Sequence, residues 1–162
     1  MLSLLAACQP ALNWREARPT ESGAVALFPC KPEVEQRPAR AGEGAMGLAH
    51  CEAAGLSFAL SWADMRDPTE AGAALRALPR ALAAKLKQPL PLAQGLQVAG
   101  MTPLPEASQH RLEGSGGVTR VAVFAYGGRV YQALMSADHD DAPAWDAFVS
   151  GLKVGSAARP AG

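Results

Sequence analysis

Residues 118–137, VTRVAVFAYGGRVYQALMSA, contain two β-rich runs that meet at a pair of glycines. Gly127 and Gly128 can adopt the positive φ angles that a two-residue hairpin turn requires, so this stretch predicts a β-hairpin. A turn at this position places Phe124 opposite Tyr131 on the neighbouring strand. The hairpin is the strongest structural signal in the sequence, and we expect the rest of the sheet to form around it.

Both faces of this hairpin are apolar, which constrains what surrounds it. The same turn places Val121 opposite Leu134, and alternate residues of the first strand point to opposite faces of the sheet. A sheet with one wet face would alternate polar and apolar side chains, so these should be central strands with other elements packed on each face. One face carries Ala122, Phe124 and Tyr126, and the other carries Val121, Val123 and Ala125.

The composition indicates one ordinary domain with many turns. A chain of 162 residues can bury a core without a metal site or a dense disulfide framework. Its 16 glycines and 13 prolines predict short elements rather than a helical bundle. Lys and Arg together number 15, as do Asp and Glu, so no overall positive field attracts nucleic acid. No apolar run reaches the roughly 18 residues of a membrane span. We expect a monomer with its domain over residues 12–154 and a disordered tail over 155–162.

The N-terminus, MLSLLAACQP, carries a pattern that resembles the bacterial lipobox. In a lipobox, small residues before a cysteine allow signal peptidase to cut, and the cysteine then carries lipid. Here residues 5–8 place Cys8 at the end of an apolar run, but no Lys or Arg precedes that run, so we expect the true start to lie upstream of Met1. Gln9, in place of Asp, resembles the signal for sorting to the outer membrane. The alternative is a frayed apolar N-terminus with a chance cysteine.

The other two cysteines, Cys30 and Cys51, are predicted to form a structural disulfide. Residues 31–40 and 45–52 are joined by a glycine-containing turn, and an antiparallel pairing about that turn brings the two cysteines near each other. An even pair also suits a chain delivered to an oxidising compartment. The alternative, a redox-active or metal-binding pair, lacks the CxxC spacing and has only His50 as a nearby imidazole.

A strand followed by a capped helix is predicted in the middle of the chain. Residues 56–65 alternate large apolar side chains with small ones, as a half-buried strand does. Asp67, Pro68 and Glu70 then form a helix-start signature, and Pro79 should kink or divide the helix. The helix has a basic side, which could contact anionic lipid headgroups, although a solvated face above a leucine stripe is favoured. The stripe comprises Leu75, Leu78, Leu82 and Leu86, and the basic side Arg76, Arg80 and Lys87.

Further strands and a C-terminal helix are predicted on either side of the central hairpin. Residues 96–101 and 108–113 are candidate strands. The run DHDD at 138–141 offers metal ligands, but four adjacent residues cannot all face one cation. Asp140 or Asp141 is instead the natural N-terminal cap for a helix over 142–152. The apolar stripe of that helix comprises Trp145, Phe148, Val149 and Leu152, and short strands are also predicted over 12–17 and 24–28.

Both ends of the domain resemble the PsbP-like α/β/α sandwich family, which includes small bacterial periplasmic lipoproteins of the DcrB type and the Mog proteins. The stretch VALFPCKP at residues 25–32 is similar to the family's apolar strand followed by FPxKP, and GRVY at 128–131 with WDAFVSGLKV at 145–154 is similar to its late part. The resemblance implies an α+β fold: a single-domain α/β/α sandwich with a mostly antiparallel twisted sheet, a long central helix and a C-terminal helix. It also implies a lipoprotein, although the matching residues include no catalytic motif and members of one fold do unrelated jobs.

No motif in the sequence calls for catalysis, a metal ion or a cofactor. There is no GxSxG or HExxH pattern, and His50, His110 and His139 are scattered. A GxGxxG match at residues 42–47 lacks the preceding strand and following helix that a dinucleotide site needs. We therefore expect a non-enzymatic, lipid-anchored periplasmic protein that offers a surface to an envelope partner.

A second interpretation is a small-molecule binding module. Its pocket would lie between helix and sheet, near Trp62, Tyr126 and Tyr131. Aromatic residues of this kind are more often part of the core. A cavity with converging polar groups would favour ligand binding, and a closed core would favour the interaction role.

Overall fold

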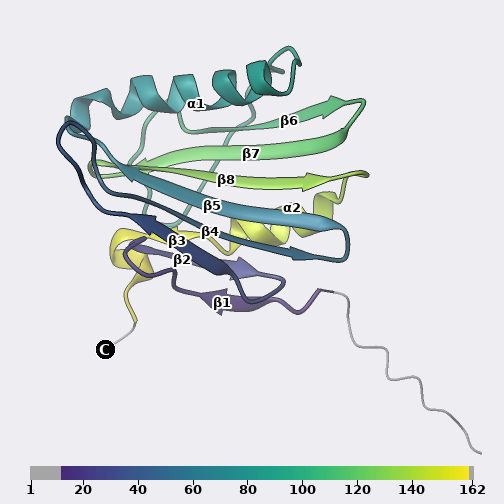
Figure 1. Cartoon of the computed structure of the whole chain (residues 1–162), viewed down its shortest axis with the longest axis horizontal. Helices are drawn as coiled ribbons and strands as arrows, with labels where there is room; N and C mark the ends of the chain where they lie inside the picture. Colours follow the sequence, from purple (N-terminus) through teal and green to yellow (C-terminus); the bar gives the residue numbers. More distant parts are fainter. Residues whose placement is uncertain (1–11, 161–162) are drawn as a thin grey trace, which may run out of the picture.

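A six-stranded antiparallel sheet forms the centre of the domain, and a three-stranded antiparallel sheet lies beneath it in Figure 1. The computed structural model describes residues 12–160. The strand order is β3-β4-β5-β8-β7-β6 in the large sheet and β1-β2-β9 in the small one. The strands are β1 (Arg15–Ala17), β2 (Ala24–Phe28), β3 (Glu33–Arg37), β4 (Met46–Ala53), β5 (Leu56–Asp64), β6 (Ser108–Gly114), β7 (Gly117–Tyr126), β8 (Arg129–Ala137) and β9 (Lys153–Val154). The helices are α1 (Ala71–Lys85) and α2 (Ala142–Ser150), with short 3-10 helices η1 (Pro68–Glu70) and η2 (Gly155–Ala158).

The predicted hairpin is confirmed as β7 and β8. Gly127 has a φ of +55°, the left-handed conformation that the tight turn requires. Phe124 pairs with Tyr131, and Val121 pairs with Leu134, as the sequence predicts. The Phe124 and Tyr131 rings stack with their centroids 5.1 Å apart. Both strands lie inside the sheet, with β5 on one side and β6 on the other.

The large sheet has an apolar core on each face, so the α/β/α arrangement is confirmed. On one face, α1 packs on β7 and β8. On the other face, α2 and the small sheet cover the strands, and Phe148 of α2 lies with its ring centroid 5.1 Å from that of Phe58. The α1-side core includes Leu75, Leu112, Val121, Val123, Ala125 and Val130, and the α2-side core includes Phe28, Phe58, Trp62, Phe124, Tyr131, Trp145 and Phe148.

Helix α1 begins where the sequence predicts but buries a different stripe. The Asp67 side chain caps η1 by accepting a hydrogen bond from the Thr69 amide at 2.9 Å. Of the two predicted outcomes at Pro79, a kink or a division, the division does not occur, because the helix runs on through this residue. Its buried line is Ala71, Leu75, Pro79 and Ala83, while Leu78 and Leu82 flank that line and Leu86 is exposed. Pro79 is therefore on the buried line of the helix, which faces β7 and β8, with small Ala side chains at two of the other buried positions.

Two segments differ from the sequence-based expectation. Residues 96–101 form no strand; Leu96 and Val98 are buried, but the segment is tied to the sheets only by isolated bridges such as Ala99 to Lys153. The tail predicted to be disordered from Gly155 onward is instead ordered over η2, and Gly155 has a φ of +63°. A Cβ atom on Gly155 would lie 2.4 Å from the Tyr126 ring, so the tail packs closely against the sheet.

The predicted disulfide joins Cys30 to Cys51, with 6.0 Å between the two Cα atoms. Cys30 lies between β2 of the small sheet and β3 of the large sheet, and Cys51 lies in β4. The bond therefore fixes the point where the chain passes from one sheet to the other, at the edge of the α2-side core.

We expect the C30A/C51A double variant to have a free energy of unfolding about 3 kcal/mol lower than the unmodified chain, because the disulfide closes a loop of about 22 residues. Urea unfolding followed by tryptophan fluorescence measures the difference. Reduction of the unmodified chain should lower its midpoint to that of the double variant, and the same reductant should leave the variant unchanged. A variant with the unmodified chain's midpoint would contradict the prediction.

Candidate functional site

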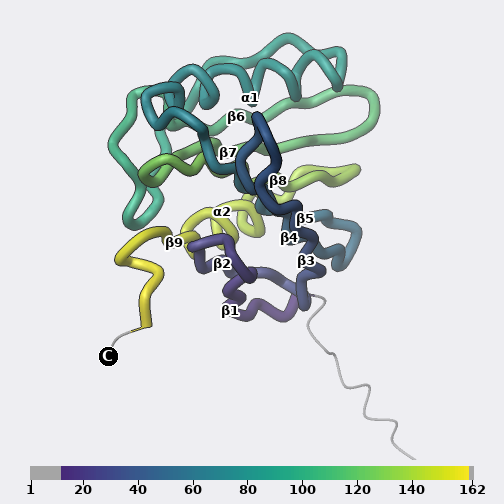
Figure 2. Tube along the Cα trace, turned by 60° about the vertical axis from the view of Figure 1, so that its left-hand side comes forward, coloured from purple at the N-terminus to yellow at the C-terminus, as the bar shows by residue number. Residues whose placement is uncertain are grey.

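Helix α1 covers only part of its face of the large sheet. The helix lies over β7 and β8, and the strands β3, β4 and β5 lie outside it, as Figure 2 shows. Beside the helix, the uncovered strands form an open groove of about 410 Å³, which we call the α1-side groove. Leu78 of α1 forms the wall of the groove on the helix side.

The sheet register gives the α1-side groove its shape. Two rows of side chains cross four strands, β3, β4, β5 and β8, and point to the α1 side. Between them, the backbone of Gly47 and its neighbours in adjacent strands forms the floor, because side chains in this middle row point to the opposite face. A Cβ atom on Gly47 would lie 2.1 Å from the Trp62 ring, so the indole covers this glycine from the other side. One row is Glu35, Leu48, Ser61 and Gln132, and the other is Arg37, Met46, Ala63 and Val130.

The charged residues of the groove lie at its β3 end and already have partners. Arg37 forms an ion pair with Glu43 at 3.2 Å. Glu35 lies 3.6 Å from the His50 imidazole. All of these side chains are exposed or half-exposed, so the pairs are screened by water and contribute little to stability. The charged residues of the groove therefore lie at its β3 rim, and the rest of the lining combines apolar side chains with Ser61 and Gln132.

The three aromatic residues predicted to line a pocket do not share one cavity. Trp62 and Tyr131 are buried in the α2-side core and contribute to the α1-side groove from its floor. Tyr126 is 44% exposed and lines a second cavity, of about 600 Å³, with Tyr131. This second cavity lies where the β1–β2 turn, the start of β8 and η2 meet.

Arginines in the second cavity are used to hold the surrounding segments. Arg129 makes a two-point contact with Asp64, at 2.6 and 2.9 Å, and also donates to the Glu21 carbonyl. Its hydrogen bond to Asp64 raises the pKa of Arg129. Arg18 donates to Glu16 at 2.9 Å and to the Ala158 carbonyl. These contacts fix the β1–β2 turn and the C-terminal segment.

Tyr131 is fixed in the same region by its hydroxyl group. The hydroxyl donates to the Ser22 carbonyl at 2.7 Å. Burial raises the pKa of this phenol, so it stays neutral and keeps its proton for that hydrogen bond. Tyr131 therefore has a structural role: it ties the start of β8 to the β1–β2 turn.

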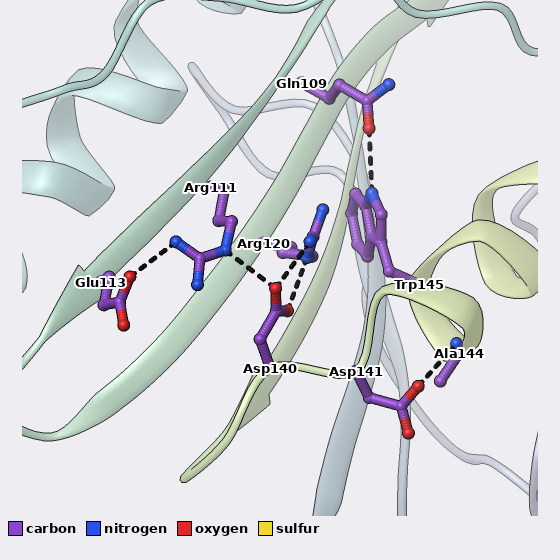
Figure 3. A network of polar contacts seen from close by, with 8 residues as sticks. All are labelled: Gln109, Arg111, Glu113, Arg120, Asp140, Asp141, Ala144 and Trp145. Carbon is purple, nitrogen blue, oxygen red and sulfur yellow. Dashed lines mark hydrogen bonds and ion pairs between the residues drawn. The ribbon is translucent and has the colours of Figure 1, made fainter.

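A network of ion pairs anchors the start of α2 to strands β6 and β7 of the large sheet (Figure 3). Arg111 and Arg120 are direct cross-strand partners on β6 and β7, an arrangement of like charges that is unfavourable by itself. Asp140 lies over both, accepting hydrogen bonds from Arg120 at 2.7 Å and from Arg111 at 2.8 Å. The Arg120 contact, followed by the Arg111 contact, holds the pKa of Asp140 well below its ordinary value.

Neighbouring residues complete this anchor. Asp141 accepts from the Ala144 amide at 2.9 Å and caps α2, as the sequence predicts for the end of the DHDD run. The Trp145 indole donates to Gln109 at 2.9 Å. The DHDD run therefore caps α2 through Asp141 and binds the sheet through Asp140. Within residues 12–160, no group of three or more His, Cys, Asp or Glu side chains is placed to hold a metal ion.

The histidines lie on separate elements. His50 is on β4, His110 on β6, and His139 in the connection from β8 to α2. His110 is buried, with Nδ1 donating to the Pro91 carbonyl at 3.0 Å and Nε2 lying 3.3 Å from the Ser108 hydroxyl. It holds the long connection after α1 against the sheet edge.

Cys8, the residue expected to carry lipid, lies outside the described residues. Across residues 12–160, no helix is both long and apolar enough to cross a membrane. Comparison of the chain with known protein families and with curated proteins finds no match in either.

We expect D140N to lower the free energy of unfolding by about 2 kcal/mol at about pH 7, because Arg111 and Arg120 lose the anion between them. A carboxyl group with a lowered folded-state pKa stabilises the fold above its unfolded pKa of about 4 and loses that effect as the pH falls further. The difference between the two proteins should therefore shrink towards about pH 3. Urea unfolding at both pH values measures it.

The matched control for this prediction is D146N. Asp146 is exposed on α2 and forms none of the ion pairs found within residues 12–160. Its substitution should change the unfolding free energy by less than about 0.5 kcal/mol. A D140N difference that does not depend on pH would show that Asp140 does not act through its charge.

Proposed function

We propose that this chain is a non-enzymatic lipoprotein of the PsbP-like type, anchored through Cys8 to the periplasmic side of the outer membrane, and that it binds an envelope protein. Its sheet, with one helix on each face, has the architecture that the resemblance to the PsbP-like family implies. The lipobox-like N-terminus supports the anchor, and the disulfide suits an oxidising compartment.

The observation that carries the binding role is the exposed edge strand of the large sheet, β3, which α1 leaves uncovered. A helix is about 10 Å wide and neighbouring strands are about 4.8 Å apart, so one helix covers about two strands of six. Strand β3 forms the outer edge of the sheet, and all five of its residues are exposed. Val34, in the middle of β3, is 40% exposed and places an apolar side chain at this edge. A partner that adds to this edge would meet both free backbone groups and an apolar side chain.

A second candidate function is small-molecule binding. The α1-side groove favours it, since its volume falls in the range of known ligand sites and it lies between helix and sheet, where the sequence places a pocket. The charged side chains at its rim, Glu35 and Arg37, contact His50 and Glu43, which lie outside the groove. A ligand held here would therefore be recognised by its apolar surface.

Lipid attachment can be tested directly. In a bacterial host, with a bacterial signal sequence placed before residues 5–8, we expect radiolabelled palmitate to be incorporated and the protein to sediment with outer-membrane fragments. The C8A variant should incorporate no label. The C30A/C51A variant is the control and should be labelled like the unmodified chain. Labelling of C8A would contradict the proposed anchor.

The proposed binding edge can be tested with a photo-reactive amino acid at Val34. A partner on β3 should give a discrete crosslinked band in intact cells after irradiation. The same amino acid at Asp146, which is also exposed but lies on α2, should give no such band. Equal crosslinking at both positions, or no band at Val34, would contradict the assignment of β3 as the partner surface.

A further inference from the structure

Strand β3 is an unpaired edge of the large sheet, and its own sequence limits which strand can be added to it. It comprises Glu33–Arg37, between Pro32 and Pro38, and within residues 12–160 no strand pairs with its outer side. Charges and prolines are the usual protection of such an edge, and β3 has both. Charges repel only a strand that places like charges opposite them, so they also define which strand fits.

The hydrogen bonds between β4 and β5 show which residues of β3 have free backbone groups. The Asp64 amide donates to the Ala45 carbonyl at 2.8 Å, so Ala45 and every second residue after it point towards β5. The residues of β4 between them point towards β3, where their partners are residues 33, 35 and 37. The N–H and C=O groups of Val34 and Gln36 therefore point outward and can bond to an added strand.

The side chains of β3 separate its charges from its apolar surface. Glu33, Glu35 and Arg37 share the α1 face, because alternate residues of a strand point to opposite faces. Val34 lies on the other face and is 40% exposed. The contacts that Glu35 and Arg37 make within the chain are exposed and screened by water, so both charges stay available to a partner.

A second copy of β3 can pair antiparallel with the first only when each residue faces one an even number of positions away, because the two α1 faces must lie on the same side of the joined sheet. Three such registers pair at least three residues of each β3. One places Glu35 opposite Glu35, and another places Glu33 opposite Glu35, so both juxtapose like charges. In the third, Gln36 lies on the two-fold axis and Glu35 of each copy lies opposite Arg37 of the other.

This third register also suits the backbone and the exposed valine. Gln36 of one copy exchanges both of its outward hydrogen bonds with Gln36 of the other. The outward amide of Val34 meets the carbonyl of Pro38, and pairing ends there because proline has no N–H to donate. The Val34 side chain lies opposite the same proline, which removes part of its apolar surface from water.

We infer that β3 pairs antiparallel with β3 of a second copy of this chain, with Gln36 on the two-fold axis and Glu35 opposite Arg37. This inference rests on the proposed binding role of β3 and names its partner. It replaces the monomer expected from the sequence with a weak, reversible dimer, since a contact between two short edge strands is smaller than a permanent interface.

Sedimentation velocity of the purified chain at increasing concentration measures the dimer. We expect a reversible rise from monomer mass to dimer mass. E35R places arginines opposite each other and R37E places glutamates opposite each other, so each should raise the dissociation constant about tenfold or more. A chain that stays monomeric up to about 1 mM would overturn the inference.

The double variant E35R/R37E tests the register, because it exchanges the two charges and keeps opposite signs facing each other. Its dissociation constant should lie within about threefold of that of the unmodified chain. An equimolar mixture of E35R and R37E should also form dimers, since every facing pair then joins opposite charges. Failure of either to recover the dimer, with all variants folded by circular dichroism, would overturn the inference.

E33R is the matched control. Glu33 lies on the same strand and the same face as Glu35, but in this register it faces Ala39 and no charge. Its substitution should change the dissociation constant less than about threefold. An effect as large as that of E35R would indicate another register and overturn the inference.

The photo-crosslink at Val34 separates this inference from the proposed function. A second copy gives a band at twice the mass of the chain, which contains both tags when two differently tagged copies are expressed together. A discrete band of another mass would leave β3 as a partner surface but overturn pairing with a second copy. Absence of any band at Val34 would contradict both.

Discussion

The stacked pair of Phe124 and Tyr131 shows the constraint on which the whole structure depends. Their strands, β7 and β8, have apolar side chains on both faces, so each face must be removed from water. On one face this is done by α1, and on the other by α2 together with a second sheet. The second sheet is needed because α2 has only nine residues and cannot cover the face alone.

The uneven cover on the α1 face follows from the same constraint. Strand β7 carries Val121 and Val123 on that face, and α1 is required to shield them from water. On β5 the corresponding positions are Ser57, Ala59, Ser61 and Ala63, which tolerate partial exposure. The helix therefore lies over the apolar strands, and the groove forms beside it. The groove therefore arises from incomplete cover of the sheet.

Local signals in the sequence were sufficient for much of this fold. The glycine pair fixed the register of the central hairpin, the glycine-containing turn predicted that Cys30 and Cys51 would meet, and Asp67 and Asp141 marked the starts of helices. Each of these features depends on residues close together in the chain. The alternation along β5 also contained the signal for an open face, since its small side chains all point to one side.

Features that depend on distant partners were not accessible in this way. Residues 96–101 have the composition of a strand, but they form only an isolated bridge, from Ala99 to Lys153, and no ladder with either sheet. The segment after Val154 looks like a loose tail, yet its glycine allows it to approach Tyr126. The lining of the groove was predicted only in part, with Trp62 and Tyr131 but not its β3 and β4 residues, because it depends on where α1 ends across the sheet. The leucine pattern also misplaced the buried stripe of that helix.

The pairing of β2 with β9 brings together two strands from opposite ends of the domain. The small sheet cannot be completed until residues 153 and 154 are available, so a polypeptide emerging from a ribosome or a translocation channel has only β1 beside β2. Contacts between such distant positions slow folding and prolong the exposure of aggregation-prone intermediates. In this architecture, a truncation that removes residues from Lys153 onward would leave one edge of β2 unpaired.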